Sequence, residues 1–132
     1  MRRLDWPAAL NAAIEAARNK PFAWGTHDCC MFAAHAVQEM TGADFAEPFR
    51  GRYSDATGAL RVLTEAGGPD LIASRALGRP IPIGFAQRGD VIMVDIEGRK
   101  ALAICLGAHA AGPGPDGLVF VPVTQWLKAW RV

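Results

Sequence analysis

The sequence Trp-Gly-Thr-His-Asp-Cys at residues 24–29 brings side chains used in nucleophilic catalysis into one short segment. Cys29 follows a loop-like stretch and begins a segment with helical periodicity, so we expect it in the first turn of a helix. Unpaired backbone N–H groups and the positive end of the helix dipole stabilise a thiolate at such a position. Cys29 is therefore a candidate nucleophile. The alternative is a small buried apolar residue, which is the usual place of a free cysteine.

Two histidines are candidates for the general base that a cysteine nucleophile needs. His27 lies two residues before Cys29 on a segment expected to be extended, so the two side chains are predicted to point roughly the same way. The alternative for His27 is packing or pinning of the loop. His109 follows a predicted strand by a few residues, and its alternative is an exposed loop histidine. Asp28 is predicted to cap the helix, and with Trp24 it is also a candidate binding residue.

Helices are predicted in the first half of the chain. Apolar residues recur at helical spacing over residues 4–18, 29–41 and 56–66. The expected N-terminal caps of these helices are Asp5, Asp28 and either Ser54 or Asp55. Residues 69–87 are weakly patterned and contain two prolines, which predicts a short helical piece followed by an irregular connection.

Strands are predicted in the second half. Residues 91–96, 102–106 and 118–123 are rich in β-forming side chains. A turn-like tetrad, residues 97–100, separates the first two strands, and the Gly- and Pro-rich residues 112–117 are predicted to be a flexible connection. Helices followed by antiparallel strands predict an α+β fold.

Three tryptophans could form a ligand-binding wall or anchor an interface. Trp126 and Trp130 have helical spacing near the end of the chain, which predicts docking onto a neighbouring protein, whereas burial in the core is the alternative. Trp24 precedes the candidate nucleophile.

Composition excludes several classes of function. The chain has 132 residues, of which 51% are hydrophobic, and a formal charge of +1, which predicts a single domain over residues 1–132 that does not bind nucleic acid. No stretch approaches the ~20 apolar residues of a membrane span, and no signal peptide is expected. Three cysteines cannot all pair, and the zinc ligands weighed have unusual spacing, so no metal or cofactor is expected. Those weighed ligands are His27, Cys29, Cys30 and His35.

Three segments resemble NlpC-type cysteine peptidases, which are papain-like hydrolases acting on peptidoglycan peptides. Residues 22–29 are similar to the segment that leads into the active-site helix of that family. Gly-Asp-Val-Ile at residues 89–92 is similar to the beginning of the family's first strand, and residues 102–107 are similar to its second strand. The resemblance extends from about residue 21 to residue 123 in the family's order and implies a papain-like fold.

The chain departs from this family where the resemblance places the catalytic base. The family has a histidine at the start of the second strand, and the matching residue here is Ala101, whose methyl group cannot accept a proton. The third, orienting polar group would come from residues 119–122, which hold no polar side chain. The resemblance therefore implies a degenerate active site, unless His27 or His109 replaces the base.

Trp-Gly-x-His-Asp-Cys near the start and Ala-Trp-Arg at residues 129–131 resemble small proteins encoded among the tail genes of tailed bacteriophages and prophages. This resemblance implies a structural or assembly protein of the tail tip, made in the bacterial cytoplasm and carried in the virion, whose partners are other tail proteins. The alternative is an active peptidase or amidase that cleaves peptidoglycan peptides with Cys29 as nucleophile.

Overall fold

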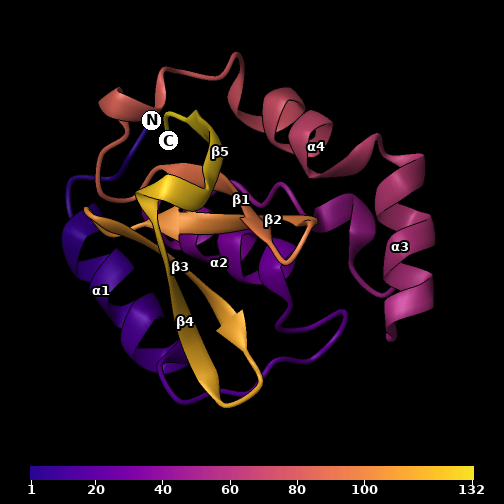
Figure 1. Cartoon of the computed structure of the whole chain (residues 1–132). Helices are drawn as coiled ribbons and strands as arrows, with labels where there is room; N and C mark the ends of the chain where they lie inside the picture. Colours follow the sequence, from indigo (N-terminus) through magenta and orange to yellow (C-terminus); the bar gives the residue numbers. More distant parts are fainter.

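The computed structural model describes residues 1–132 and has an α+β architecture, which confirms the predicted class (Figure 1). The helices are α1 (Trp6–Ala17), α2 (Cys29–Thr41), α3 (Ala56–Glu65) and α4 (Gly68–Leu77). The strands are β1 (Val91–Ile96), β2 (Arg99–Cys105), β3 (His109–Gly114), β4 (Gly117–Pro122) and β5 (Trp126–Trp130). They form one antiparallel sheet in the order β4-β3-β2-β1-β5.

The predicted helix boundaries are close to those observed. α2 begins at Cys29 because the Asp28 side chain accepts the Met31 N–H at 2.9 Å. It ends at Thr41, before the C-cap Gly42, whose φ of +85° suits a residue without a Cβ. Asp55 caps α3 in the same way. Asp5 occupies the N-cap position of α1, as predicted, and its carbonyl accepts the Ala9 N–H at 3.1 Å, but its side chain makes no capping hydrogen bond.

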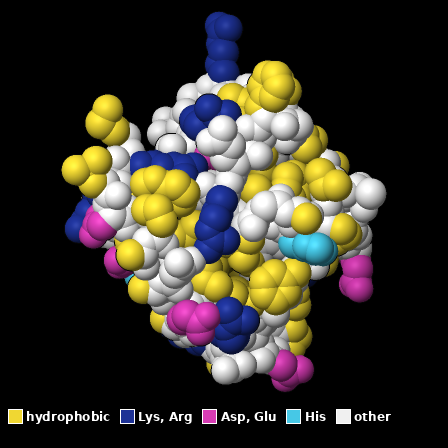
Figure 2. Space-filling view, turned by 90° about the vertical axis from the view of Figure 1, so that its left-hand side faces the viewer, with side chains coloured by type: hydrophobic (Ala, Val, Ile, Leu, Met, Phe, Trp, Pro, Cys, Tyr) yellow, Lys and Arg dark blue, Asp and Glu magenta, His cyan; other side chains and the backbone are white.

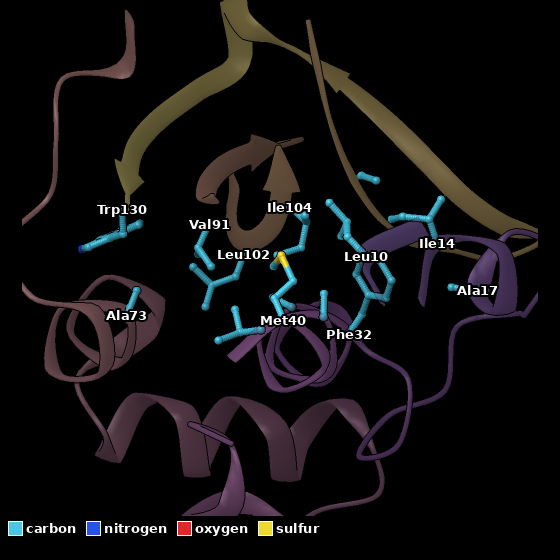
Figure 3. Close-up of a cluster of buried hydrophobic side chains, with 14 of the residues drawn as sticks. Leu10, Ile14, Ala17, Phe32, Met40, Ala73, Val91, Leu102, Ile104 and Trp130 are labelled. Atoms are coloured by element: carbon cyan, nitrogen blue, oxygen red, sulfur yellow. The ribbon is translucent and has the colours of Figure 1, made fainter. Parts of the chain in front are cut away.

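The largest hydrophobic cluster lies between the sheet and the helices α1, α2 and α4 (Figure 3). Its bulky members are fully buried and include Leu10, Phe32, Met40, Leu102, Ile104 and Trp130. Burying each side chain of this size contributes roughly 1.5–3 kcal/mol. This cluster therefore holds α2, and Cys29 at its start, against the sheet.

A second cluster covers the other face of the sheet, where the segment around η2 (Ile83–Phe85) packs. Neighbouring residues of a strand point to opposite faces, and β2 follows this rule. Leu102 and Ile104 belong to the helix-side cluster, whereas Ala103 belongs to the second cluster with Ala101 packed against it.

The turn between β1 and β2 is shorter than predicted. β2 begins at Arg99, so the turn consists of Glu97 and Gly98 rather than residues 97–100. Both turn residues have positive φ, +53° and +83°, as a two-residue hairpin turn of type I′ requires.

The prediction of a flexible connection over residues 112–117 is wrong. Gly112, Pro113 and Gly114 belong to β3 and are buried, and β4 begins at Gly117. Pairing with β4 and contact with the end of α1 order this hairpin, because a Cβ on Gly117 would lie 2.3 Å from the Arg18 carbonyl oxygen. Its Gly- and Pro-rich composition concealed the strand from sequence-based prediction.

The helical interpretation of residues 126–130 is also wrong, because they form β5. Trp130 is fully buried, and its Nε1–H donates to Ser74 Oγ at 3.1 Å. Trp126 is 7% exposed, and its Nε1–H donates to the Val121 carbonyl at 3.0 Å. The docking role predicted for the two indoles is contradicted by their burial in the core of the chain itself.

The ends of the chain lie side by side (Figure 1). They meet at Asp90, a fully buried residue just before β1, which pairs with Arg2 and accepts the backbone N–H of Val132. None of the helices has the length and apolar character needed to traverse a membrane. Figure 2 shows Lys and Arg side chains scattered among hydrophobic ones on one face, without a broad patch of a single charge.

Candidate functional site

Cys29, at the start of α2, lines a cleft of about 1130 Å³. The cleft lies between the N-terminus of α2, the pair α3 and α4, the β1–β2 turn and the β3–β4 hairpin. Its lining is mostly apolar and includes Phe22, Trp24, Ala59, Leu60, Leu63, Ile72, Ile96, Leu102, Pro113 and Val119. Cys29 is partly exposed in this cleft, and the structure places Trp24 and Asp28 there with it.

Asp28 shapes the rim of the cleft by accepting hydrogen bonds from neutral donors. Its carboxylate accepts the N–H groups of Met31 and Gly25, each at 2.9 Å, and the hydroxyl of Tyr53 at 2.7 Å. Gly25 has a φ of +84°, and a Cβ there would lie 2.3 Å from the Tyr53 carbonyl oxygen. The predicted capping role of Asp28 is confirmed. Tyr53 lies 25 residues away from Asp28 in the chain and carries no local signal that would predict its place in the site.

The Cys29 thiol is not activated by its surroundings. Burial, and then the negative charge of Asp28, raise its pKa to about 11, although the Arg99 guanidinium acts in the opposite direction. The same two causes raise the pKa of the neighbouring Cys30 thiol to about 12. Burial and the aspartate that caps this helix therefore act against the thiolate that the helix N-terminus is expected to favour.

No histidine lines the cleft that contains Cys29. His27 is 5% exposed and borders a separate small pocket of about 160 Å³ with Lys20 and His35. Its ring lies edge-on to Phe32 at 5.8 Å, which fits the packing alternative. Burial and the positive charge of Lys20 lower the His27 pKa. His109 is exposed at the start of β3, and it also lies outside the cleft.

The positions that the family resemblance assigns to the base and to the orienting group are apolar in the structure. Ala101 lines the cleft, but its methyl group is on the face of β2 opposite to Leu102, which packs toward α2. Val119 lines the cleft from β4 and offers only an isopropyl group. The lining of the cleft therefore contains a thiol and no imidazole.

The charged groups at the rim of the cleft are mainly basic. Arg99 and Lys100 are exposed at the start of β2, and neither forms an ion pair with another residue of the chain. Asp28 is the acidic residue in the lining, and it is 2% exposed. The two rim cations had no recognisable pattern in the sequence, because their importance depends on the cleft beside them.

The side chains weighed as zinc ligands do not gather into a group that could hold a metal ion. A model of a protein family, described as a domain of unknown function (DUF6950), matches residues 1–132. The chain belongs to the DUF6950 family. No curated protein matches the sequence of this DUF6950 member.

The geometry limits what the cleft of this DUF6950 chain can do chemically. Hydrolysis by a cysteine nucleophile uses a thiolate and a group that shuttles its proton. In this cleft burial and Asp28 raise the pKa of the Cys29 thiol, and the lining contains no histidine. An apolar concave surface with basic groups at its rim is suited to binding.

Proposed function

We propose that this DUF6950 chain is a structural or assembly protein of the phage-tail tip, built on an NlpC-type papain-like fold whose active site is degenerate. The observation that carries the proposal is the cleft itself, in which Cys29 stands without a histidine and with a pKa of about 11. General acid–base catalysis typically raises a reaction rate by about 10²–10⁴-fold, so a protein whose cleft lacks it would be a poor hydrolase.

The papain-like part of the proposal is supported by the order of the elements. A cysteine begins a helix that packs on an antiparallel sheet, and Gly-Asp at residues 89–90 precedes the first strand. The tail part is supported by the sequence resemblance at residues 24–29 and 129–131. In this proposal the partners are other tail proteins, and the protein is made in the bacterial cytoplasm before it joins the virion.

A genetic test separates assembly from catalysis. Deleting the gene from the phage or prophage genome that encodes it is expected to abolish complete tails, whereas Cys29→Ser is expected to leave tail number and infectivity unchanged. Normal tails after deletion would contradict the structural role. Tails that fail with Cys29→Ser, in a variant that folds normally, would favour the alternative of an active peptidase or amidase.

A biochemical test addresses that alternative directly. Purified protein incubated with peptidoglycan is expected to release no new peptides or amino termini above the level of the Cys29→Ser control. Release that depends on Cys29 would contradict the proposal and would support cleavage of cell-wall peptides. The comparison is informative because both proteins keep the same cleft.

A further inference from the structure

The smaller pocket beside His27 lies on the helical side of the molecule, apart from the cleft. It has a volume of about 160 Å³ and is lined by the second half of α1, the loop before α2 and the first half of α2. None of its lining residues also lines the cleft. Its inner wall is the edge of the main hydrophobic cluster, because Ala17 and Phe32 belong to both (Figure 3). A space of this size holds several water molecules or one small ion.

Each polar side chain of this pocket can donate a hydrogen bond, and none of them is a carboxylate. These side chains are Lys20, Thr26, His27, His35 and Arg50. Lys20 is exposed and forms no ion pair with another residue of the chain. The whole chain has 14 lysines and arginines against 13 acidic residues, so a lining with two cations, two histidines and no acid is a local concentration of positive charge.

Two further donors of the pocket lack a strong acceptor within the chain. Arg50 directs its Nε and Nη2 to Asp44 at 2.7 and 3.0 Å, but its Nη1 has only the sulfur of Met31, a weak acceptor, at 3.5 Å. The Nε2 of His35 lies 3.9 Å from a Glu39 carboxylate oxygen, which is beyond hydrogen-bond distance. Both residues therefore retain a donor for an occupant of the pocket.

The inner polar group of the pocket is the imidazole of His27. The residue is 5% exposed, and its Nε2 is buried without a hydrogen-bond partner. Such a nitrogen has lost its contact with water and gained nothing in exchange, which is unfavourable. An imidazolium donates from both ring nitrogens, and rotation about the Cβ–Cγ bond changes which of them faces the pocket. His27 therefore lacks a partner that an occupant of the pocket can provide.

A water molecule would give His27 a neutral partner and leave the surrounding positive charge unbalanced. We propose that the pocket binds a small tetrahedral oxyanion of the phosphate and sulfate class. The oxygens of the ion accept hydrogen bonds from the His27 imidazolium at the inner end and from Lys20 and Thr26 at the exposed outer end. The inference does not rest on the proposed function, because the two pockets are separate.

The charges around His27 determine how pH controls this binding. Burial and the positive charge of Lys20 lower the pKa of His27, and His35 acts in the same direction, whereas Asp28 opposes them. Arg50, which also lines the pocket, keeps its charge at every pH considered. A bound oxyanion favours the imidazolium and so raises the pKa of His27. Binding therefore takes up a proton, and the affinity should be higher at about pH 5.5 than at about pH 8.

The test is a titration of sodium sulfate into the isotope-labelled full chain, followed by NMR at constant ionic strength and at about pH 6, where histidine titrates. We expect saturable shifts of the ring signals of His27 and His35. The exposed His109 at the start of β3 is an internal control whose signals should not move. Sulfate keeps both charges over the range in which histidine titrates, so a weaker affinity at about pH 8 reports on the protein.

Three variants report on the protein side. Lys20→Glu is expected to weaken sulfate binding by about tenfold or more. Arg79→Glu makes the same change of charge at an exposed position outside the pocket, and as the matched control it should bind sulfate like the unmodified chain. Lys20→Glu should also raise the pKa of His27 in the absence of sulfate, since Lys20 lowers it. His27→Gln, with its other amide signals unchanged, should remove most of the pH dependence of binding.

Two outcomes would overturn the inference. The absence of saturable shifts at His27 with either sulfate or phosphate would mean that water alone fills the pocket. Equal weakening by Lys20→Glu and Arg79→Glu would mean that the ion is attracted by net charge and not held in the pocket.

A comparison of inorganic phosphate with phenyl phosphate distinguishes two sources of the ligand. Tighter binding of the inorganic ion would support a free ion as the ligand. Tighter binding of phenyl phosphate would support a phosphate group carried by a larger molecule.

Discussion

Two buried aspartates, Asp28 and Asp90, make similar numbers of hydrogen bonds but stand in opposite electrostatic surroundings. Asp90 is fully buried and has two guanidinium partners, Arg2 at 2.7 Å and Arg131 at 3.5 Å. Asp28 is 2% exposed and accepts only from neutral donors, including the Tyr53 hydroxyl. One negative charge is compensated by cations, and the other is not.

The difference explains the role of each site. The compensated charge of Asp90 joins the two ends of the chain at the beginning of the sheet, so its effect is on stability. The uncompensated charge of Asp28 acts on its neighbours and raises the pKa of Cys29 and Cys30. The hydrogen bonds of Asp28 thus fix the shape of the cleft rim, and its charge disfavours the thiolate forms of Cys29 and Cys30.

Removing the compensated charge is expected to have the largest effect. Asp90→Ala leaves two arginines without their buried partner, and breaking a buried ion pair costs about 3–5 kcal/mol of unfolding free energy. Urea denaturation measures this loss. Asp116→Ala, in the exposed turn before β4, is the control and should change stability by less than about 0.5 kcal/mol. Equal losses in the two variants would refute the assigned role of Asp90.

The uncompensated site is expected to contribute less to stability. Asp28→Ala removes the cap of α2 and leaves the Tyr53 hydroxyl without its partner, so we expect a loss of about 2–3 kcal/mol in the same experiment. Asp55→Ala removes an exposed cap of the same type and should cost about 1 kcal/mol. A smaller loss at position 28 than at position 55 would contradict the account.

Tyr53→Phe isolates one bond of the uncompensated site. The substitution removes the hydroxyl that donates to Asp28 at 2.7 Å and keeps the aromatic ring in its cluster. We expect a loss of about 1–2 kcal/mol in thermal or urea unfolding, because a hydrogen bond to a charged acceptor is stronger than a neutral one. An unchanged stability would mean that Gly25 and Met31 alone satisfy the carboxylate.

The smallest effect is expected in the pH dependence of stability at high pH. Burial, together with the charge of Asp28, raises the pKa of Cys29, Cys30 and Tyr53 in the folded chain. The unfolded chain loses these protons from about pH 8.5 upward while the folded chain keeps them, so the unfolding free energy should fall as the pH rises. Urea midpoints at pH 7, 9 and 10 measure this, and Asp28→Asn should make the decline shallower.

The sequence predicted the features that depend on local signals. The bounds of α2 follow from Asp28 before it and Gly42 after it, and both act through residues within one turn. The first strand, residues 91–96, was predicted from a run of β-forming residues that is buried on both faces of the sheet. Local patterns of this kind do not require knowledge of the rest of the chain.

The features that could not be predicted from the sequence depend on contacts between distant segments. β3 contains two glycines and a proline, so pairing with β4 rather than propensity makes it a strand. β5 has helical spacing of its tryptophans, but it pairs with β1. In the site, Cys29 and Asp28 were identified from a motif, whereas Tyr53 and Arg99 become relevant only when folding brings them near.

The central claim is that the cleft holds a thiol that is not activated. The most direct measurement is the rate of alkylation of Cys29 by iodoacetamide as a function of pH, in a Cys30→Ala variant so that the peptide containing residue 29 reports a single thiol. We predict a rate that rises with a midpoint near pH 11, as the pKa of the folded thiol requires. A midpoint below about pH 7.5, in the range of activated cysteines, would contradict the account and restore Cys29 as a nucleophile.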